Sequence, residues 1–507
     1  MGEHTYVFGQ FALHAGGELQ RDGRPVELGN RALRILEVLV AAGGRVVTKE
    51  EIMDRVWPGL VVEDGNISVQ IASLRKALGT RDSGQDWIVT VPRIGYRFSG
   101  ATTASTAESV GQGREPTVAV LPFANLSPDL SQDYFADGIV ADLITGLSRF
   151  KSFSVVSRSS SFTYKGKAVD VRQVGRELGV RYLLEGSVRL AEDKVRVTAQ
   201  LVDASEGHHL WASNFDGKVA EVFEFQDRIS ESVIGRVEPQ IRRTEIERSR
   251  RKWPQNPKAY DYLLRAMPHF YSNDPAGYGI ALEDLERAIA LEPDYATALA
   301  YASWAIVRRV TVSLKPLAPA EAAHGLHLTR LALNYGEDDP VVQAICGHSL
   351  IAGGMRSEGL AAARRARIAN PNNVVVLLSA GTSNMLAGDL AEAEQCYRRA
   401  HELSPGSPEA YECLAGVGYC RLLEGRYDDA LEWLEKSRAS LANWPPSLWV
   451  TIAAFAHLDR LEEARSTLAH LLSFAPYTSL DGVRLIAARS DGRWDVIVSG
   501  LERAGLR

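Results

Sequence analysis

The side chains best suited to contact another molecule lie between Asp64 and Phe98. Lysine and arginine bind phosphate through their charge, and small polar side chains allow a close approach to base edges. The stretch offers both kinds, and its basic residues are Arg75, Lys76, Arg93 and Arg97. The chemistry that these residue types indicate is contact with a nucleic acid.

An amphipathic helix is needed to present the first half of this stretch. Its apolar residues fall on one stripe at helical spacing: Ile67, Ile71, Leu74 and Leu78. The opposite face would carry Ser68, Val69, Ala72, Ser73, Arg75 and Lys76. Asp64 suits the start of such a helix, and Gly79 suits its end. Taken alone, the segment is equally compatible with an ordinary surface helix.

The second half, WIVTVPRIGYRF, predicts a two-stranded β-ribbon with Arg93 at its tip and Arg97 on the returning strand. A helix fits the major groove of DNA, and a basic ribbon tip can reach the neighbouring backbone or minor groove. The helix and the ribbon together therefore predict a DNA-contacting face.

The preceding residues predict two more helices and a set of short strands. In NRALRILEVLVAAGG, Leu33, Leu36 and Val40 share one helical face, and in TKEEIMDRVW, Thr48 and Glu51 have the spacing of a capping box. Residues 6–29 favour short strands with Gly-rich turns. This order of elements resembles the winged-helix effector domain of OmpR/PhoB-type regulators over residues 1–100.

The resemblance implies sequence-specific binding to double-stranded promoter DNA, with the helix from Asp64 to Leu78 as the recognition helix and Arg93 at the wing tip. The residues that it implies at the DNA are Asn66, Ser68, Val69, Ala72, Ser73, Arg75, Lys76, Arg93 and Arg97. Family members often carry arginine where this chain has Ala72 and Ser73. Because arginine–guanine pairs are the commonest specific contact, we expect binding to depend on several copies or on DNA shape.

Length and charge limit the possibilities further. A chain of 507 residues predicts about three domains, and its formal net charge is -6. Residues 1–100 hold 12 basic and 12 acidic side chains, so we expect moderate, salt-sensitive affinity. We expect a cytoplasmic protein, because there is neither a signal-peptide pattern nor an apolar run long enough for a membrane span. The four cysteines, Cys346, Cys396, Cys413 and Cys420, lack paired metal-ligand spacing and are predicted to lie in the core.

Residues 101–116 are small and polar and predict a flexible linker. Residues 117–253 then predict a mixed-sheet α/β domain in the order β-α-β-α-β-β-β-α, ending in a long connecting helix. The domain resembles the TolB N-terminal module found in bacterial regulators and some adenylyl cyclases. The resemblance implies a fold and an order of domains but no reaction. The first strand ends in PFAN rather than in the acidic pair of a receiver domain, so we expect no phosphoacceptor control.

Two polar groups in this domain are candidate contacts. Ser157, Arg158, Ser159 and Lys165 could hold an anion in a ligand pocket, and a plain polar loop is the alternative. The basic run from Arg242 to Lys252 suits a solvated helix end, and a second DNA or partner contact is the alternative.

Residues 254–507 predict a tetratricopeptide repeat domain. Small residues recur in the pattern of this family, with Ala393, Ala430 and Ala464 separated by 37 and 34 residues. The pattern is irregular between Ser303 and Leu333, where we expect an insertion or a bend. Stacked helix pairs form a concave surface, which we expect to bind a peptide or protein segment.

The predicted fold class is multidomain: a winged helix-turn-helix, a mixed-sheet α/β domain and an α-solenoid of tetratricopeptide repeats. The arrangement resembles HilA-like regulators, which lack a receiver domain. We expect a DNA-binding transcriptional regulator without catalytic activity, cofactor or metal. Its partners would be promoter DNA, RNA polymerase, a protein bound by the repeats and further copies of the chain.

Two alternatives to a DNA-binding regulator remain. One is an interaction scaffold that uses the winged helix for protein contacts, and the other is an enzyme with its site in the α/β domain. Within the regulator hypothesis, the C-terminal domains could also inhibit DNA binding until a partner releases them.

Overall fold

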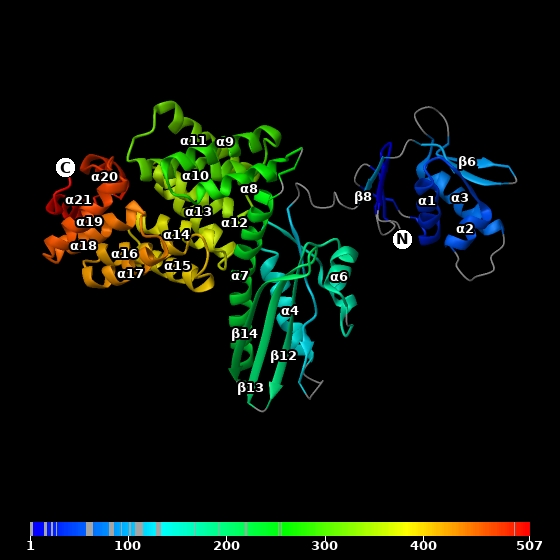
Figure 1. Cartoon of the computed structure of the whole chain (residues 1–507), viewed down its shortest axis with the longest axis horizontal. Coiled ribbons are helices and arrows are strands. Elements are labelled where there is room, and N and C mark those ends of the chain that lie inside the picture. The colour runs from blue at the N-terminus through cyan, green and yellow to red at the C-terminus, as the bar shows by residue number, and fades with distance from the viewer. Residues whose placement is uncertain are drawn as a thin grey trace. The chain divides into compact units, whose positions relative to one another are not determined.

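Figure 1 shows the chain as a computed structural model that divides into two compact units, Met1–Gln112 and Gly113–Arg507. The structure describes residues 4–14, 18–21, 24–26, 28–56, 64–80, 86–92, 94–100, 103–106, 115–127, 133–167, 169–191, 193–218, 221–251, 253–254, 256–490 and 492–507.

The first unit has the predicted winged-helix architecture. Four strands come first: β1 (His4–Phe8), β2 (Phe11–His14), β3 (Glu18–Arg21) and β4 (Arg24–Pro25). They are followed by α1 (Asn30–Ala41), β5 (Val46–Thr48), α2 (Lys49–Val56), α3 (Asp64–Leu78), β6 (Ile88–Val91), β7 (Gly95–Phe98) and β8 (Thr103–Thr106). One sheet has the order β4-β3-β2-β1-β8, and the other has the order β5-β7-β6.

Two features hold this unit together. Phe8 makes edge contacts with Trp87 and Phe98, at 5.3 and 5.0 Å between ring centroids, and so joins the two sheets. Gly95 lies so close to β5 that a side chain there would meet the Val47 carbonyl oxygen at 2.0 Å. Glycine is therefore required for the hairpin to pack against β5.

The predicted linker is shorter than the sequence indicated. Thr103–Thr106 forms β8, which pairs with β1 in antiparallel register, with Tyr6 opposite Ala104. The prediction of a linker over residues 101–116 is therefore wrong for these four residues. The sequence did not indicate this strand, because its small polar residues lack the alternation of apolar side chains that is typical of strands. They form a strand because the edge of β1 is available for pairing.

The second unit begins with the predicted α/β domain. Its elements are β9 (Thr117–Val120), β10 (Ala124–Asn125), α4 (Asp133–Leu147), β11 (Ser154–Val155), α5 (Arg158–Ser161), η3 (Phe162–Tyr164), α6 (Val171–Leu178), β12 (Tyr182–Ala191), β13 (Lys194–Asp203), β14 (His208–Lys218) and α7 (Val222–Arg251). The strand order is β11-β9-β12-β13-β14, parallel from β11 to β12 and antiparallel from β12 to β14. The mixed sheet is confirmed.

Helices cover both faces of this sheet. Ile139 of α4 and Val233 of α7 share a buried cluster with Tyr182 on one face. On the other face, Val174 of α6 packs with Ala119 and Leu183. The alternation of side chains along β12 explains this arrangement, since neighbouring residues point to opposite faces.

The remaining residues form seven helix pairs within the described part of the chain. They are α8 (Ala259–Phe270) with α9 (Pro275–Leu291), α10 (Ala296–Ser313) with α11 (Pro319–Tyr335), α12 (Pro340–Ala352) with α13 (Arg356–Ala369), α14 (Val374–Ala387) with α15 (Leu390–Leu403), α16 (Ala410–Leu423) with α17 (Tyr427–Ser440), α18 (Pro445–His457) with α19 (Leu461–Phe474), and α20 (Leu480–Ala487) with α21 (Asp495–Ala504).

The irregular repeat that the sequence indicated is the pair α10–α11. The helices α12, α14 and α16 begin at residues 340, 374 and 410, so their starts are 34 and 36 residues apart. From α10 to α12 the interval is 44 residues, from 296 to 340, because α10 and α11 are longer than the typical helices of the repeat. All four cysteines are buried and unpaired, as predicted.

Helix α7 joins the α/β domain to the repeats. The Arg242 guanidinium lies 2.7 Å from a carboxylate oxygen of Glu409 and 3.4 Å from one of Glu238. Arg399 of α15 donates to Glu231 at 2.5 Å. The Arg242–Lys252 run was expected to lie on a solvated helix end, but its first residue is buried against the repeats. The interpretation failed there because the acidic partner is 167 residues away in the sequence.

The repeats also contact each other across the inside of their superhelix. Arg308 of α10 donates to both carboxylate oxygens of Glu412 on α16, at 2.8 and 2.6 Å. These helices belong to the second and fifth pairs, whereas in a solenoid each repeat normally contacts its neighbours alone. Val310 of α10 and Leu314, which directly follows this helix, also lie in one buried cluster with Trp449 and Val483 of the last two pairs.

Candidate nucleic-acid interface

Helix α3 presents the candidate interface. Ile67, Ile71, Leu74 and Leu78 are buried, as the spacing predicted. The other face is open: Asn66, Ser68, Val69, Ala72, Ser73 and Lys76 are exposed. Val69 is 64% exposed, which is unusual for an aliphatic side chain on a folded domain. An exposed apolar side chain among small polar neighbours suits contact with base edges and thymine methyl groups in a major groove.

Arg75 fixes α3 to the hairpin. Its Nε and Nη2 atoms donate to the Ile88 carbonyl oxygen at 3.1 and 2.8 Å, and Nη2 also donates to Thr90 Oγ1 at 2.8 Å. The sequence pattern placed Arg75 at the DNA. These bonds direct its guanidinium to β6, so we assign it the role of a positioning residue that holds helix and hairpin in one orientation.

The hairpin presents its two faces differently. Tyr96 is buried toward the core, and its hydroxyl lies 3.5 Å from Ser68 Oγ on α3. Arg97 follows directly and is exposed, so its side chain leaves the opposite face of β7. Arg97 therefore does not share a surface with the open face of α3, although the sequence grouped them.

The tip of the hairpin carries the predicted wing contact. Arg93 lies outside the described residues. Its neighbour Ile94 is 53% exposed, and Pro92 is exposed as well. An exposed isoleucine next to an arginine position suits a tip that enters a groove of DNA.

Other basic residues near the candidate interface are neutralised within the domain. Arg45 and Arg55 lie 2.8 and 3.2 Å from the carboxylate of Glu51. The hydrogen bond from Arg45 lowers the pKa of Glu51 below its usual value. Thr48 caps the start of α2 at the predicted spacing, because the Glu51 backbone N–H donates to Thr48 Oγ1 at 3.1 Å. Among the described residues on the open face of α3, the exposed basic side chain is Lys76.

The second predicted site, in the α/β domain, does not form an anion cradle. Lys165 donates to both carboxylate oxygens of Asp137, at 2.8 and 2.7 Å, and this bond raises its pKa. Arg158 covers the ring of Phe162 at 4.4 Å, and Ser157 caps the four-residue helix α5. With Lys165 neutralised, the alternative of a polar loop describes these residues better. Ser159 is part of that loop, with its hydroxyl 3.1 Å from Ser157 Oγ.

Two positions of the interface were missed. Tyr96 and Thr90 connect the hairpin to α3 through Ser68 and Arg75. The alternation of TVPRIGYRF places both side chains on the core-facing side of the ribbon, which is the signal that could have found them.

Three family models match consecutive parts of the chain. Residues 23–98 match "Transcriptional regulatory protein, C terminal", residues 114–232 match "HilA/YgeH-like transcriptional regulator, second domain", and residues 374–443 match "Tetratricopeptide repeat". The winged-helix, HilA-like and repeat parts predicted from the sequence are thereby confirmed. None of the helices in the described residues combines the length and apolarity of a membrane span.

Curated proteins are similar over parts of the chain. "Transcriptional regulator HilA" of Salmonella typhi is 24% identical over 40% of this chain and 36% of its own length. "Phosphate regulon transcriptional regulatory protein PhoB" of Pseudomonas aeruginosa is 39% identical over 15% of this chain and 34% of its own length. "Putative adenylate cyclase 3" of Rhizobium meliloti is 40% identical over 38% of this chain and 32% of its own length. The chain thus spans about a third of each of these relatives.

Proposed function

We propose that this chain binds double-stranded DNA sequence-specifically and regulates transcription. Its residues 23–98 match the C-terminal domain family of transcriptional regulatory proteins. The observation that carries this proposal is the open face of α3, with exposed Val69 and Lys76, held against the hairpin by Arg75. A helix with small side chains on its free face can lie deep in a major groove, and a fixed hairpin can contact the flanking backbone.

The balance of charge shapes how this binding works. Arg45 and Arg55 are paired with Glu51, so a single domain offers few cations for phosphate contacts. The residues proposed at the DNA are Asn66, Ser68, Val69, Ala72, Ser73, Lys76 and Arg93, with Arg75 as the positioning residue and Arg97 on the other hairpin face. We infer that two or more copies bind adjacent half-sites, because their contacts add up on one stretch of DNA. Such a regulator acts in the cytoplasm, where it can also contact RNA polymerase.

The second unit receives the signal or the protein partner in this proposal. The Arg308–Glu412 bridge crosses the interior of the repeats, where the expected peptide would lie in an open superhelix. A protein partner of the repeats would therefore bind on another face. We assign the chain no reaction: the matched families are regulators, and the similarity to the Rhizobium relative covers about a third of that protein.

The test is retention of labelled genomic fragments by the full chain at low salt. Wild-type protein should retain a discrete set of fragments, and Lys76→Ala and Arg93→Ala should each weaken retention. Arg364→Ala is the matched control, because it removes one exposed positive charge from α13 in the second unit. If no fragments are retained, or if neither variant binds more weakly than the control, the winged helix serves another purpose, such as protein contacts.

A further inference from the structure

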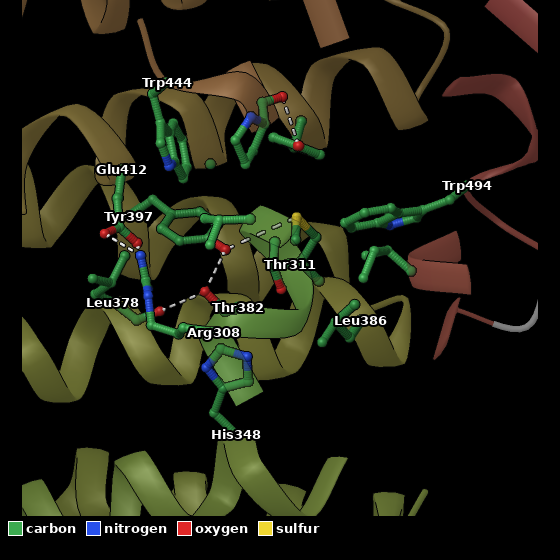
Figure 2. A pocket seen from close by; sticks show the side chains of 16 residues that line it. Arg308, Thr311, His348, Leu378, Thr382, Leu386, Tyr397, Glu412, Trp444 and Trp494 are labelled. Carbon is green, nitrogen blue, oxygen red and sulfur yellow. Dashed lines mark hydrogen bonds and ion pairs between the residues drawn. The ribbon is translucent and has the colours of Figure 1, made fainter. Parts of the chain in front are cut away.

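The interior of the repeat domain contains a pocket that the proposed DNA contact does not use. It holds about 100 Å³, room for several water molecules or a small organic molecule. Its walls come from α10, α12, α14, α15, α16, α18, α20 and the residues just before α21. Figure 2 shows Trp444 and Trp494 on opposite sides of this pocket, with Tyr397 below Trp444 in this view.

The pocket exists because the superhelix closes on itself. The Arg308–Glu412 ion pair joins the second and fifth helix pairs, and Arg308 also donates to Tyr278 Oη at 2.7 Å and to Asn273 Oδ1 at 2.8 Å. At the far end, Gly482 of α20 approaches Leu314 so closely that an added Cβ would lie 2.6 Å from the leucine Cβ. These contacts cross the interior of the repeats in the described part of the chain and leave a partly open pocket there.

Two of the buried indole donors without an acceptor among the described residues belong to the pocket wall. Trp444 and Trp494 are 8% and 5% exposed, and within the described part of the chain no atom accepts a hydrogen bond from the Nε1 of either. Buried indole N–H groups normally find a partner, because desolvating an unpaired donor is unfavourable. Two such donors in one cavity indicate a ligand that brings acceptor atoms.

The other polar groups of the pocket indicate that this ligand is uncharged. Trp304 donates to His348 Nδ1 at 3.1 Å, so this ring nitrogen already accepts a hydrogen bond from within the fold. Arg308 is paired with Glu412 through two hydrogen bonds, so the pair contributes no net charge. A charged ligand would lose its hydration, and the charged pair among the described lining residues, Arg308 and Glu412, is already engaged with itself.

We propose that this pocket binds a small, flat, uncharged molecule with hydrogen-bond acceptor atoms, such as an aromatic amide, ketone or ester. The rings of Trp444, Tyr397 and Trp494 would enclose its flat body, and the two indole N–H groups would donate to its acceptors. The pocket gives a place to the signal-receiving role of the second unit. The role of the bound molecule as a signal rests on the proposed function. The binding itself does not, because the experiment measures it without DNA.

The experiment uses the full chain labelled with 5-fluorotryptophan and followed by ¹⁹F NMR. The chain has 9 tryptophans, and the Trp444→Phe and Trp494→Phe variants identify the two pocket signals by their loss. Benzamide is the uncharged probe, and benzoate and benzylamine are charged probes of similar size. We expect benzamide to shift both pocket signals with a Kd of about 1 mM, as for a fragment of this size, and the charged probes to bind at least tenfold more weakly.

Variants test the place of binding. Trp494→Phe keeps an aromatic ring but removes the donor, and should weaken benzamide binding about fivefold. Trp433→Phe is the matched control: this ring lies outside the pocket between Arg398 and Lys436, and its loss should leave the affinity unchanged. Thr311→Phe fills the pocket and should abolish the shifts, with circular dichroism confirming the fold.

Three results would overturn the proposal. The first is that the pocket signals do not move at about 10 mM benzamide, which is roughly tenfold above the expected Kd. The second is that benzoate or benzylamine shifts these signals as much as benzamide does. The third is that a folded Thr311→Phe protein still binds benzamide fully. Each of them can occur whether or not the winged helix binds DNA, so failure here leaves the proposed DNA contact untouched.

Discussion

Lys76 and Arg75 are neighbours in sequence, but the structure gives them different roles, and alanine substitutions should separate these roles. Lys76 is exposed on the open face of α3, where its ammonium can bind a phosphate. Arg75 uses Nε and Nη2 to hold Ile88 and Thr90 of the hairpin. Lys76→Ala should therefore change electrostatic binding, and Arg75→Ala should change the stability of the domain.

The magnitude for Lys76 follows from counterion release. Each phosphate contact makes the slope of log K against log salt concentration steeper by about 0.9, so its loss makes the slope shallower by the same amount. Relative to 1 M salt, loss of that contact weakens binding about fivefold at 0.15 M and about twofold at 0.5 M. The side chain is exposed and makes no hydrogen bond to another described residue, so the free energy of unfolding should change by less than about 0.5 kcal/mol.

The magnitude for Arg75 follows from its three hydrogen bonds. Their loss from a half-buried guanidinium should reduce the free energy of unfolding by about 2 kcal/mol. DNA binding should weaken as well, because the hairpin is no longer fixed to α3. The salt slope should stay close to that of the wild type, since no phosphate contact is removed.

The assay is fluorescence anisotropy on a retained genomic fragment over a salt series, with urea unfolding of the same proteins. Two results together agree with the structure. Lys76→Ala should have a shallower salt slope and normal stability, and Arg75→Ala should have the wild-type salt slope and a lower free energy of unfolding. If Arg75→Ala lowers the slope as much as Lys76→Ala does and unfolds like the wild type, Arg75 contacts phosphate and its positioning role is wrong.

Other predictions concern the framework around these sites. A fragment of residues 1–100 should unfold at a lower urea concentration than one of residues 1–112, because it lacks the strand that covers β1; equal midpoints would contradict the β1–β8 pairing. Arg242→Met should destabilise the second unit by about 3 kcal/mol in urea unfolding, because it leaves two buried carboxylates without their cation. A change below about 1 kcal/mol would argue against a buried ion pair. Gly347→Ala should cost about 1–3 kcal/mol, since the new Cβ would meet backbone of the paired helix at 2.8 Å, whereas Gly279→Ala has open space and should be neutral or stabilising. Equal thermal midpoints for the two glycine variants would contradict the close approach of α12 and α13.

Much of the fold could be predicted from local patterns in the sequence. The stripe from Ile67 to Leu78 predicted both the helix and its buried face, because a helical repeat needs no knowledge of distant residues. The small residues Ala393, Ala430 and Ala464 predicted the helix pairs, and all three are fully buried. Such positions can be found from sequence because the constraint repeats along the chain.

Contacts between distant segments could not be found in the same way. Nothing near Arg308 or Glu412 in the sequence indicates that they meet, as they are 104 residues apart. Arg75 looked like a DNA contact because its partners, the Ile88 carbonyl oxygen and Thr90, lie beyond a loop whose geometry the sequence does not state. A basic residue on a predicted free face can therefore be held by partners that the local sequence does not indicate.

The most direct measurement of the central claim is a genome-wide map of DNA occupancy for the wild-type chain and for Val69→Glu. Val69 is 64% exposed, so the substitution should leave the fold intact while placing a negative charge at the proposed groove-facing surface. We predict discrete occupied sites that share a sequence motif for the wild type, and their loss for Val69→Glu at equal protein levels. An absence of discrete sites, or the same sites for both proteins, would contradict DNA recognition by the open face of α3.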